Sequence, residues 1–319
     1  MKILANDGIS AAGLEKLEAA GFEVSTTNIP QEELIDAIND QNIVGLLVRS
    51  ATKVREDLIN ACPGLKLIGR GGVGMDNIDV DYARSKGLHV INTPGASSQS
   101  VAELVIGQCF SISRSTYDAN REMPINGSSY FKTLKKKYAK GQELRGKTLG
   151  IIGFGRIGQA LASYALGAGM DVKAVDLFTE PVNVPVQIGT NQIVDVSITP
   201  SGDMDAILGS CDYLSLHVPK QADRSAVMTA DTFEKLKDGV IIVNAARGGV
   251  VDEDAVIKYL DNRKIRGIAL DVFENEPTPR EDLLKHAKIA STPHIGAATG
   301  EAQTRIGIEL ADQIINLLK

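Results

Sequence analysis

Short apolar runs alternate, along the first third of the chain, with longer stretches in which apolar residues recur every three to four positions. The short runs predict strands and the longer stretches predict helices. Strands separated by helices are typical of right-handed β-α-β units and a parallel sheet. The predicted strands are residues 3–5, 23–26, 44–48, 65–69 and 89–92, and the predicted helices are residues 11–20, 31–39, 55–61 and 80–85.

A second series of the same kind begins after a basic stretch. Residues 98–122, before it, have the spacing of one long helix, apolar on one side and long enough to connect two domains. Residues 181–200 and 274–280 have no clear period, and the first of these is an irregular insertion or an extra hairpin. The second series predicts strands at 148–153, 171–176, 213–218, 240–244, 267–271 and 288–291, and helices at 157–168, 204–208, 231–237, 253–262 and 300–318.

The two series predict an α/β protein with two doubly wound, Rossmann-like parallel-sheet domains. Residues 1–98 and 297–319 form a discontinuous, flavodoxin-like domain, and residues 99–296 form the second domain. The chain then passes between the domains twice, and we expect the functional site in the cleft between them. A length of 319 residues suits two domains of ordinary size.

Charge and cysteine content narrow the function classes. The chain has 34 Lys and Arg against 40 Asp and Glu, a net charge of −6, which argues against nucleic-acid or anionic-membrane binding. Cys62, Cys109 and Cys211 form no C-x-x-C pair, so neither a disulfide framework nor a thiolate metal site is predicted. With no signal peptide and no apolar run of about 18 residues, we expect a cytoplasmic protein.

A glycine-rich motif marks the strongest candidate binding site. The run Gly153-Phe-Gly155-Arg156-Ile157-Gly158 follows an apolar strand and opens a helix, and Asp176 ends the next strand. This is the dinucleotide fingerprint: the glycines permit a tight turn, close approach to a pyrophosphate and helix–strand packing, while the acid binds ribose hydroxyls. The charge of Asp176 repels a 2′-phosphate, which favours NAD over NADP. A bare turn, or another nucleotide such as FAD, remains an alternative.

Three further motifs follow later strands, at the sheet edge where open α/β sheets bind ligands. They place Arg247 before two glycines, Glu276 before a proline, and His294 in a Pro-His-Ile-Gly run. Arg can hold a carboxylate, His can exchange a proton near neutral pH, and a carboxylate can orient the imidazole. Taken singly, these residues could equally be a surface ion-pair arginine, a loop carboxylate and a core histidine.

Together with Gly153–Gly158, these blocks resemble the D-isomer-specific 2-hydroxyacid dehydrogenase family over nearly the whole chain. The resemblance implies that Arg247 binds the substrate carboxylate and carbonyl, that Glu276 supports the histidine, and that His294 is the acid/base. It also implies a homodimer formed through the NAD-binding domain. Residues at the same strand ends are expected to line the cofactor, although His217 could be a plain strand end: His217, Val218, Pro219, Ala245, Ala246, Asp271 and Gly296.

The remaining motifs concern the substrate. Arg49 and Ser50 end one strand, and the glycine-rich turn containing Val73 and Gly74 could form an anion nest. With the blocks above, they most resemble family members that oxidise D-3-phosphoglycerate to 3-phosphohydroxypyruvate, the first step of phosphorylated serine biosynthesis. We expect a short form without a C-terminal regulatory domain. Sister reactions on hydroxypyruvate, glyoxylate or D-lactate, and an NAD-sensing corepressor, remain alternatives.

A phosphorylated substrate requires cations. Residues 132–147 are rich in lysine, and Lys135 and Lys137, from this chain or a partner subunit, are candidates with Arg49 for the phosphate. The alternative is an ordinary solvated basic face.

Overall fold

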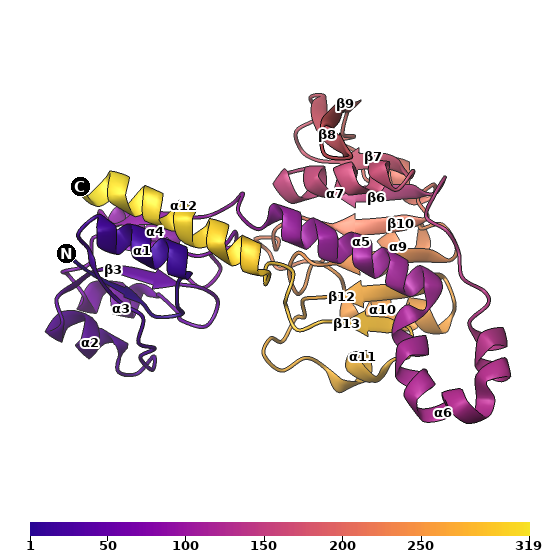
Figure 1. The fold of residues 1–319 in the computed structure, drawn as a ribbon, viewed down its shortest axis with the longest axis horizontal. Coiled ribbons are helices and arrows are strands. Elements are labelled where there is room, and N and C mark those ends of the chain that lie inside the picture. Colours follow the sequence, from indigo (N-terminus) through magenta and orange to yellow (C-terminus); the bar gives the residue numbers. More distant parts are fainter. The chain divides into compact units, whose positions relative to one another are not determined.

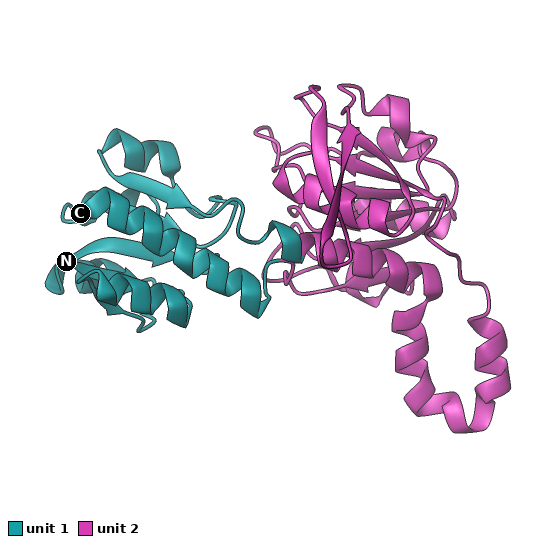
Figure 2. Ribbon diagram, turned by 45° about the horizontal axis from the view of Figure 1, so that its top comes forward, with its two compact units in different colours: residues 1–100, 297–319 teal, residues 101–296 magenta.

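The computed structural model describes residues 1–319, which fold into two compact units. Unit 1 contains residues 1–100 and 297–319, and unit 2 contains residues 101–296 (Figure 2). The first boundary lies two residues after the one expected from the sequence, and the second lies where it was expected. No helix is both long and apolar enough to cross a membrane.

Unit 1 is built on a five-stranded parallel sheet (Figure 1). The strand order β2-β1-β3-β4-β5 is the flavodoxin-like order of the doubly wound folds. The strands are β1 (Lys2–Ala5), β2 (Glu23–Ser25), β3 (Ile43–Val48), β4 (Leu67–Arg70) and β5 (His89–Asn92).

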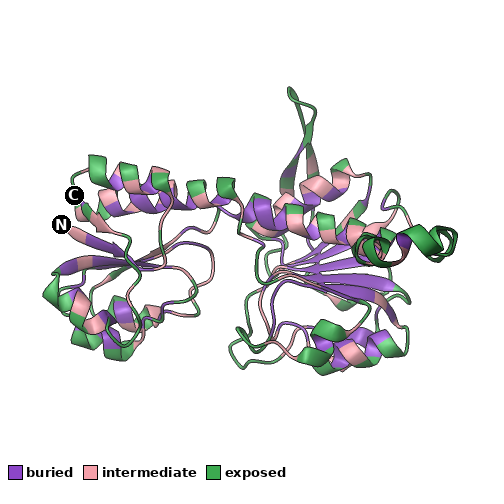
Figure 3. Ribbon diagram, turned by 60° about the horizontal axis from the view of Figure 1, so that its bottom comes forward, coloured by how far each residue is buried: buried purple, intermediate pink, exposed green.

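Helices cover both faces of this sheet. The helices are α1 (Ala11–Ala19), α2 (Leu34–Asp40), α3 (Glu56–Ala61), α4 (Val80–Ser85) and α12 (Gly300–Leu318). Successive strand residues point to opposite faces, so Ile3 packs with α1 and α12 while Leu4 packs with α2, α3 and α4. The central strands β1, β3 and β4 are therefore mostly buried, as Figure 3 shows, whereas the edge strands β2 and β5 are more exposed.

Glycines allow α1 and α12 to pack closely in unit 1. A side chain at Gly13 would lie 2.6 Å from the carbonyl oxygen of Gly307, and one at Gly307 would overlap with Ser10. Because α12 is the last helix and α1 the first, this contact brings residues 300–318 onto the N-terminal part of the chain. The discontinuous domain expected from the sequence depends on it.

Unit 2 contains a six-stranded parallel sheet with the order β13-β12-β11-β10-β6-β7. The order along the sheet changes direction between β6 and β10, and such switch points are where open α/β sheets bind ligands. The strands are β6 (Thr148–Ile152), β7 (Asp171–Val175), β10 (Tyr213–Leu216), β11 (Val240–Asn244), β12 (Ile265–Leu270) and β13 (Ile289–Ser291).

The helices of unit 2 also lie on both faces of its sheet. Helices α5 and α7 cover one face and α8 to α11 cover the other. Their bounds are α5 (Ser98–Arg114), α6 (Thr116–Lys137), α7 (Arg156–Gly167), α8 (Asp205–Leu208), α9 (Ala230–Glu234), α10 (Glu253–Asp261) and α11 (Glu281–Lys285). Helix α11 was not expected from the sequence.

The long helix predicted for residues 98–122 is wrong in its length. Ser115 has a left-handed backbone (φ 49°), which ends α5 and starts α6 in a new direction. Helix α6 runs away from the rest of unit 2 and turns back, with a non-helical residue at Tyr130 (Figures 1 and 2). We call residues 116–137 the arm.

Residues 181–200 contain the hairpin that the sequence left as one of two options. Strands β8 (Val182–Ile188) and β9 (Gln192–Ile198) pair antiparallel with each other only. Val184 and Ile198 join the core around α7, so the hairpin is anchored at its base.

Candidate active site

The three predicted catalytic residues follow three neighbouring strands of unit 2. Arg247 follows β11, Glu276 follows β12 and His294 follows β13, and these strands pair in parallel. Parallel strands have their carboxyl ends at one edge of a sheet, so residues that are nearly 50 positions apart in the sequence lie near one another there. A hollow of about 440 Å³ lies there, lined in part by Phe273, Glu276 and His294.

Glu276 and His294 form a hydrogen-bonded pair. Oε2 of Glu276 lies 2.8 Å from Nδ1 of His294, and Oε1 of Glu276 accepts the backbone N–H of Phe273. Burial acts to raise the pKa of Glu276, but the hydrogen bonds from His294 and Phe273 outweigh it and hold the pKa below its ordinary value. An ionised Glu276 can only accept, so Nδ1 carries a proton and Nε2 is the nitrogen available to a substrate.

Asp271 holds the turn that carries His294. Its buried carboxylate accepts the hydroxyl of Thr292 and the backbone N–H groups of Ile295 and Gly296, at 2.6 to 2.8 Å. His294 itself has a left-handed backbone, with φ 54°. Such a conformation persists only where surrounding contacts enforce it. The cofactor role expected for Asp271 and Gly296 stays a prediction. Their hydrogen bond to each other positions the turn of His294, which was not predicted from the sequence.

The turn after β11 places Arg247. Buried Asn244 accepts the N–H of Ala246 and donates to the carbonyl oxygen of Arg247, which closes the turn around Ala245 and Ala246. The positive charge of Arg247 is close enough to contribute to the lowered pKa of Glu276. Gly248 then packs so tightly against the backbone of Phe273 and Glu274 that no side chain fits.

The glycine-rich turn after β6 has the shape expected for a dinucleotide site. Gly153 has φ 92°, and Gly158 packs directly on its carbonyl oxygen. Gly155 is the N-cap of α7 and has open space where a side chain would be, next to the free N–H groups of Arg156 and Ile157. Asp176 accepts the N–H of Phe154 from this turn over 2.6 Å. These residues fit the pyrophosphate and ribose of NAD.

His217 and Val218 lie beside this turn, at the switch point between β6 and β10. A side chain at Gly153 would lie 2.7 Å from the carbonyl oxygen of His217 and 2.9 Å from Cγ1 of Val218. Nε2 of His217 lies 2.8 Å from Oγ of Ser215, while its buried Nδ1 has no hydrogen-bond partner. Burial lowers the pKa of His217 to about 4, so the ring is neutral at pH 7. An unpartnered buried nitrogen beside the fingerprint supports the predicted cofactor wall, which Pro219 continues.

In unit 1, the loop after β3 is held by two polar side chains, one acceptor and one donor, whose role was not predicted from the sequence. Asp7 accepts the N–H groups of Arg49 and Thr52, and the amide of Asn77 donates to the carbonyl oxygens of the same two residues. The signal was available, because Asp7 closely follows β1 at the same sheet edge. These hydrogen bonds of Asp7 and Asn77 fix the backbone on either side of Ser50.

A second arginine, also missed, stands next to Arg49 in unit 1. Arg70 ends β4, where it pairs with Val48. Both arginines flank one turn: a side chain at Gly71 would lie 3.6 Å from Cγ of Arg49, and one at Gly72 would overlap with the Arg70 guanidinium. The same segment continues to Val73 and Gly74, and the Val73 carbonyl oxygen accepts from Asn92. The Arg70 guanidinium folds back on this turn, where its Nη1 donates to the carbonyl oxygen of Gly71 over 3.2 Å and its Nε is buried.

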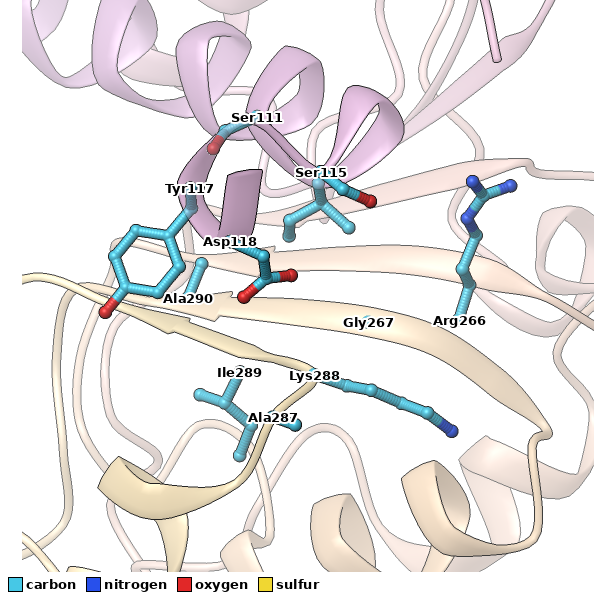
Figure 4. Close-up of a pocket in the computed structure, with 11 residues that line it drawn as sticks. Ser111, Ser115, Tyr117, Asp118, Arg266, Gly267, Ala287, Lys288, Ile289 and Ala290 are labelled. Atoms are coloured by element: carbon cyan, nitrogen blue, oxygen red, sulfur yellow. The ribbon is translucent and has the colours of Figure 1, made fainter. Parts of the chain in front are cut away.

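Lys135 and Lys137 are not brought to the catalytic residues of their own chain. The arm starts beside the amino ends of β12 and β13, around a hollow of about 120 Å³ lined by Ser115, Asp118 and Lys288 (Figure 4). Just after the arm, the carbonyl oxygen of Lys140 accepts from Arg266, at the same edge. Lys137 also pairs with Glu122 within the arm. Glu276 and His294 lie at the opposite, carboxyl edge.

Fold and site together define a dinucleotide-dependent oxidoreductase. The family model described as D-isomer specific 2-hydroxyacid dehydrogenase, NAD binding domain, matches residues 106–296. The chain is 42% identical over 300 residues to a hydroxypyruvate reductase of Thermotoga maritima, covering 93% of this chain and 91% of that one. It is 39% identical to a D-3-phosphoglycerate dehydrogenase of Archaeoglobus fulgidus, covering all of this chain and 58% of that protein.

Among solved structures, the NAD⁺-bound 3-phosphoglycerate dehydrogenase of Entamoeba histolytica is similar, with a TM-score of 0.78 and 28% identity over all of this chain and 95% of that one. The chain belongs to the D-isomer-specific 2-hydroxyacid dehydrogenases. NAD is the cofactor of this chain, as its match to the NAD-binding domain model and the NAD⁺-bound neighbour show.

Proposed function

We propose that the chain oxidises D-3-phosphoglycerate to 3-phosphohydroxypyruvate, the first step of phosphorylated serine biosynthesis. The observation that carries this proposal is the pair Arg49 and Arg70, which flank one turn in unit 1. Arg247 meets the need of a 2-hydroxy acid for a carboxylate ligand, and Arg49, the predicted phosphate ligand, suits a second anionic end on the substrate, with Arg70 adding positive charge to the same turn. The match to the phosphoglycerate dehydrogenase of A. fulgidus over the whole chain supports it.

The chemistry follows from the pair Glu276–His294. In the oxidation, Nε2 of His294 takes the proton of the C2 hydroxyl, and Glu276 stabilises the imidazolium that results. Arg247 holds the carboxylate and polarises the forming carbonyl oxygen. Bound NAD supplies the other half of the reaction by accepting the hydride from C2. In the reverse direction, His294 returns its proton to the carbonyl oxygen.

A second candidate is the reduction of hydroxypyruvate, favoured by the match to the T. maritima enzyme over nearly the full length of both chains. The two functions differ only at the distal end of the substrate. NADH oxidation measured with phosphohydroxypyruvate, hydroxypyruvate, glyoxylate and pyruvate separates them. The proposal predicts the highest kcat/KM for the phosphorylated acid, by about 10-fold or more from its added charged hydrogen bonds. Equal or higher kcat/KM for hydroxypyruvate favours the second candidate, and NAD binding without turnover favours a sensor protein.

We further propose that the chain is a homodimer formed through unit 2, with the arm in the interface. Ile125, Tyr130 and Phe131 of the arm are 78%, 60% and 58% exposed, which is unusual for large apolar side chains on one segment. In a dimer, Lys135 and Lys137 of the partner subunit could serve the phosphate. Neutralising residues 135–137 then raises KM for 3-phosphoglycerate, and an unchanged KM contradicts the phosphate role. Ile125→Asp with Phe131→Asp should halve the molar mass in solution.

The cysteines support a cytoplasmic location. Cys62, Cys109 and Cys211 are all free and buried, as suits a reducing compartment.

A further inference from the structure

The backbone of Phe273 and Glu274 is held by three different parts of unit 2. The N–H of Phe273 donates to Oε1 of Glu276, over 2.9 Å. The N–H of Glu274 donates to Oε1 of Glu253, also over 2.9 Å. On its third side, the peptide between Phe273 and Glu274 packs on Gly248, which directly follows Arg247. We call the backbone of Phe273 and Glu274 the strip. It contacts both the turn that carries Arg247 and the turn that carries Glu276.

Glu253 is an unusual residue for a surface helix. It is the first residue of α10 and only 5% exposed, and its Oε2 has no hydrogen-bond partner. Burial raises the pKa of Glu253, while the N–H of Glu274 acts to lower it. Placing a carboxyl group in such a site costs free energy that an apolar side chain would avoid. The site therefore calls for a role beyond filling space.

Helix capping does not explain Glu253. Asp252 is the N-cap of α10, and its Oδ1 accepts the N–H groups of Asp254 and Ala255. The first turn of the helix is thus served without Glu253. What Glu253 alone supplies is an acceptor for Glu274, two residues before the glutamate that bonds His294.

We propose that Glu253 is a positioning residue of the dehydrogenase, which fixes the turn that aims Glu276 at His294. The inference rests on the proposed roles of Glu276 and His294. Without the acceptor, the N–H of Glu274 loses its protein partner and is left to bond water, so this backbone moves off Gly248 and toward the solvent. Glu276 moves with it, because its Oε1 is bonded to Phe273. The imidazolium formed during oxidation then loses part of its stabilisation, and Arg247 loses the surface against which Gly248 packs.

Two substitutions at Glu253 separate positioning from packing. Glu253→Leu keeps the volume and removes the acceptor, whereas Glu253→Gln keeps an acceptor oxygen without the charge. We expect Glu253→Leu to lower kcat about 10-fold and to move the acid limb of the kcat–pH profile to lower pH. KM for NAD stays within about twofold. Glu253→Gln should restore most of the turnover and the position of the acid limb.

The control is Asp231→Ala, which removes an exposed acid from the first turn of α9. It should change neither kcat nor the profile. If Glu253→Leu does not fold, Gly248→Ala displaces the same strip from the other side and should give the same loss of kcat and the same shift. A folded Glu253→Leu or Gly248→Ala enzyme with the wild-type pH profile overturns the inference, as does a Gln variant as impaired as the Leu variant.

The test also distinguishes this inference from the function on which it rests. If His294→Ala keeps wild-type turnover, the proposed chemistry fails, and the inference fails with it. If His294→Ala is inactive while Glu253→Leu keeps the wild-type profile, only the inference fails.

Discussion

The backbone N–H of His294 donates to the carbonyl oxygen of Asp271 over 2.9 Å, and this bond joins the end of β13 to the end of β12. The carboxylate of Asp271 secures the next two residues of the same turn. One buried residue thus holds the backbone of His294, the proposed acid/base, while Glu276 holds the direction of its ring. Preorganisation of this kind is what proton transfer at a defined atom requires.

His294→Ala should lower turnover by roughly 10² to 10⁴ and leave the fold intact, because it removes the group that accepts the substrate proton. Steady-state kinetics with circular dichroism tests this. His286→Ala is the matched control, since His286 follows α11 and its ring contacts Asp261 and the N–H of Lys288, at the amino end of β13, rather than Glu276. Near wild-type turnover for His294→Ala contradicts the acid/base role.

His217 should make the protein less stable in mild acid. An unfolded histidine binds a proton near pH 6.5, whereas burial lowers the pKa of His217 to about 4. Between these values the unfolded chain carries a proton that the folded chain lacks. The free energy of unfolding therefore falls as the pH drops from 6.5 to 4, by at most about 3 kcal/mol.

Urea unfolding of the wild type and His217→Asn at pH 7, 6 and 5 measures this effect. The wild type should lose more stability than the variant over this range. Parallel losses in the two proteins would show that His217 titrates normally in the folded state.

Asp176→Ala should weaken the preference for NAD over NADP, because Asp176 supplies the negative charge next to the ribose site. We expect kcat/KM with NAD to fall about 10-fold or more, and the NAD-to-NADP ratio to fall with it. Asp171→Ala, at the opposite end of β7, is the control and should leave the ratio unchanged. An unchanged ratio in Asp176→Ala contradicts the assignment.

Asp7→Ala should impair substrate binding without touching the cofactor. The side chain accepts two backbone N–H groups and the hydroxyl of Thr52, so its loss releases the loop that carries Arg49. We expect KM for D-3-phosphoglycerate to rise about 10-fold, with KM for NAD unchanged. Asp36→Ala, on the exposed side of α2, controls for loss of charge in unit 1. A rise in both KM values would point to general damage instead.

The candidate site residues of unit 2 could be predicted from the sequence because each belongs to a short, continuous sequence motif. Strand, glycine turn and helix follow one another around Gly153, and Arg247, Glu276 and His294 each come soon after an apolar strand. A parallel sheet then brings them together without further information. Residues that act across the chain were missed: Asp7 holds a loop more than 40 residues away, and Glu253 holds Glu274.

The break at Ser115 could not be predicted from local signals. Serine is not a residue that usually takes a left-handed backbone, and the apolar spacing of α5 continues past it. The arm separates from the sheet there, so its lysines lie at the edge opposite to the one suggested by charge alone. The sequence shows that lysines are concentrated in this segment, but where they lie in the fold depends on where α5 ends.

The most direct test of the proposed substrate compares kcat/KM for phosphohydroxypyruvate and hydroxypyruvate in the wild type and in Arg49→Ala. We expect the wild type to prefer the phosphorylated acid at least about 10-fold. Arg49→Ala should lose most of that preference while its kcat/KM for hydroxypyruvate changes little, because the carboxylate ligand Arg247 and the pair Glu276–His294 are intact. A wild type that reduces both acids equally well, or an Arg49→Ala variant that keeps the full preference, would contradict it.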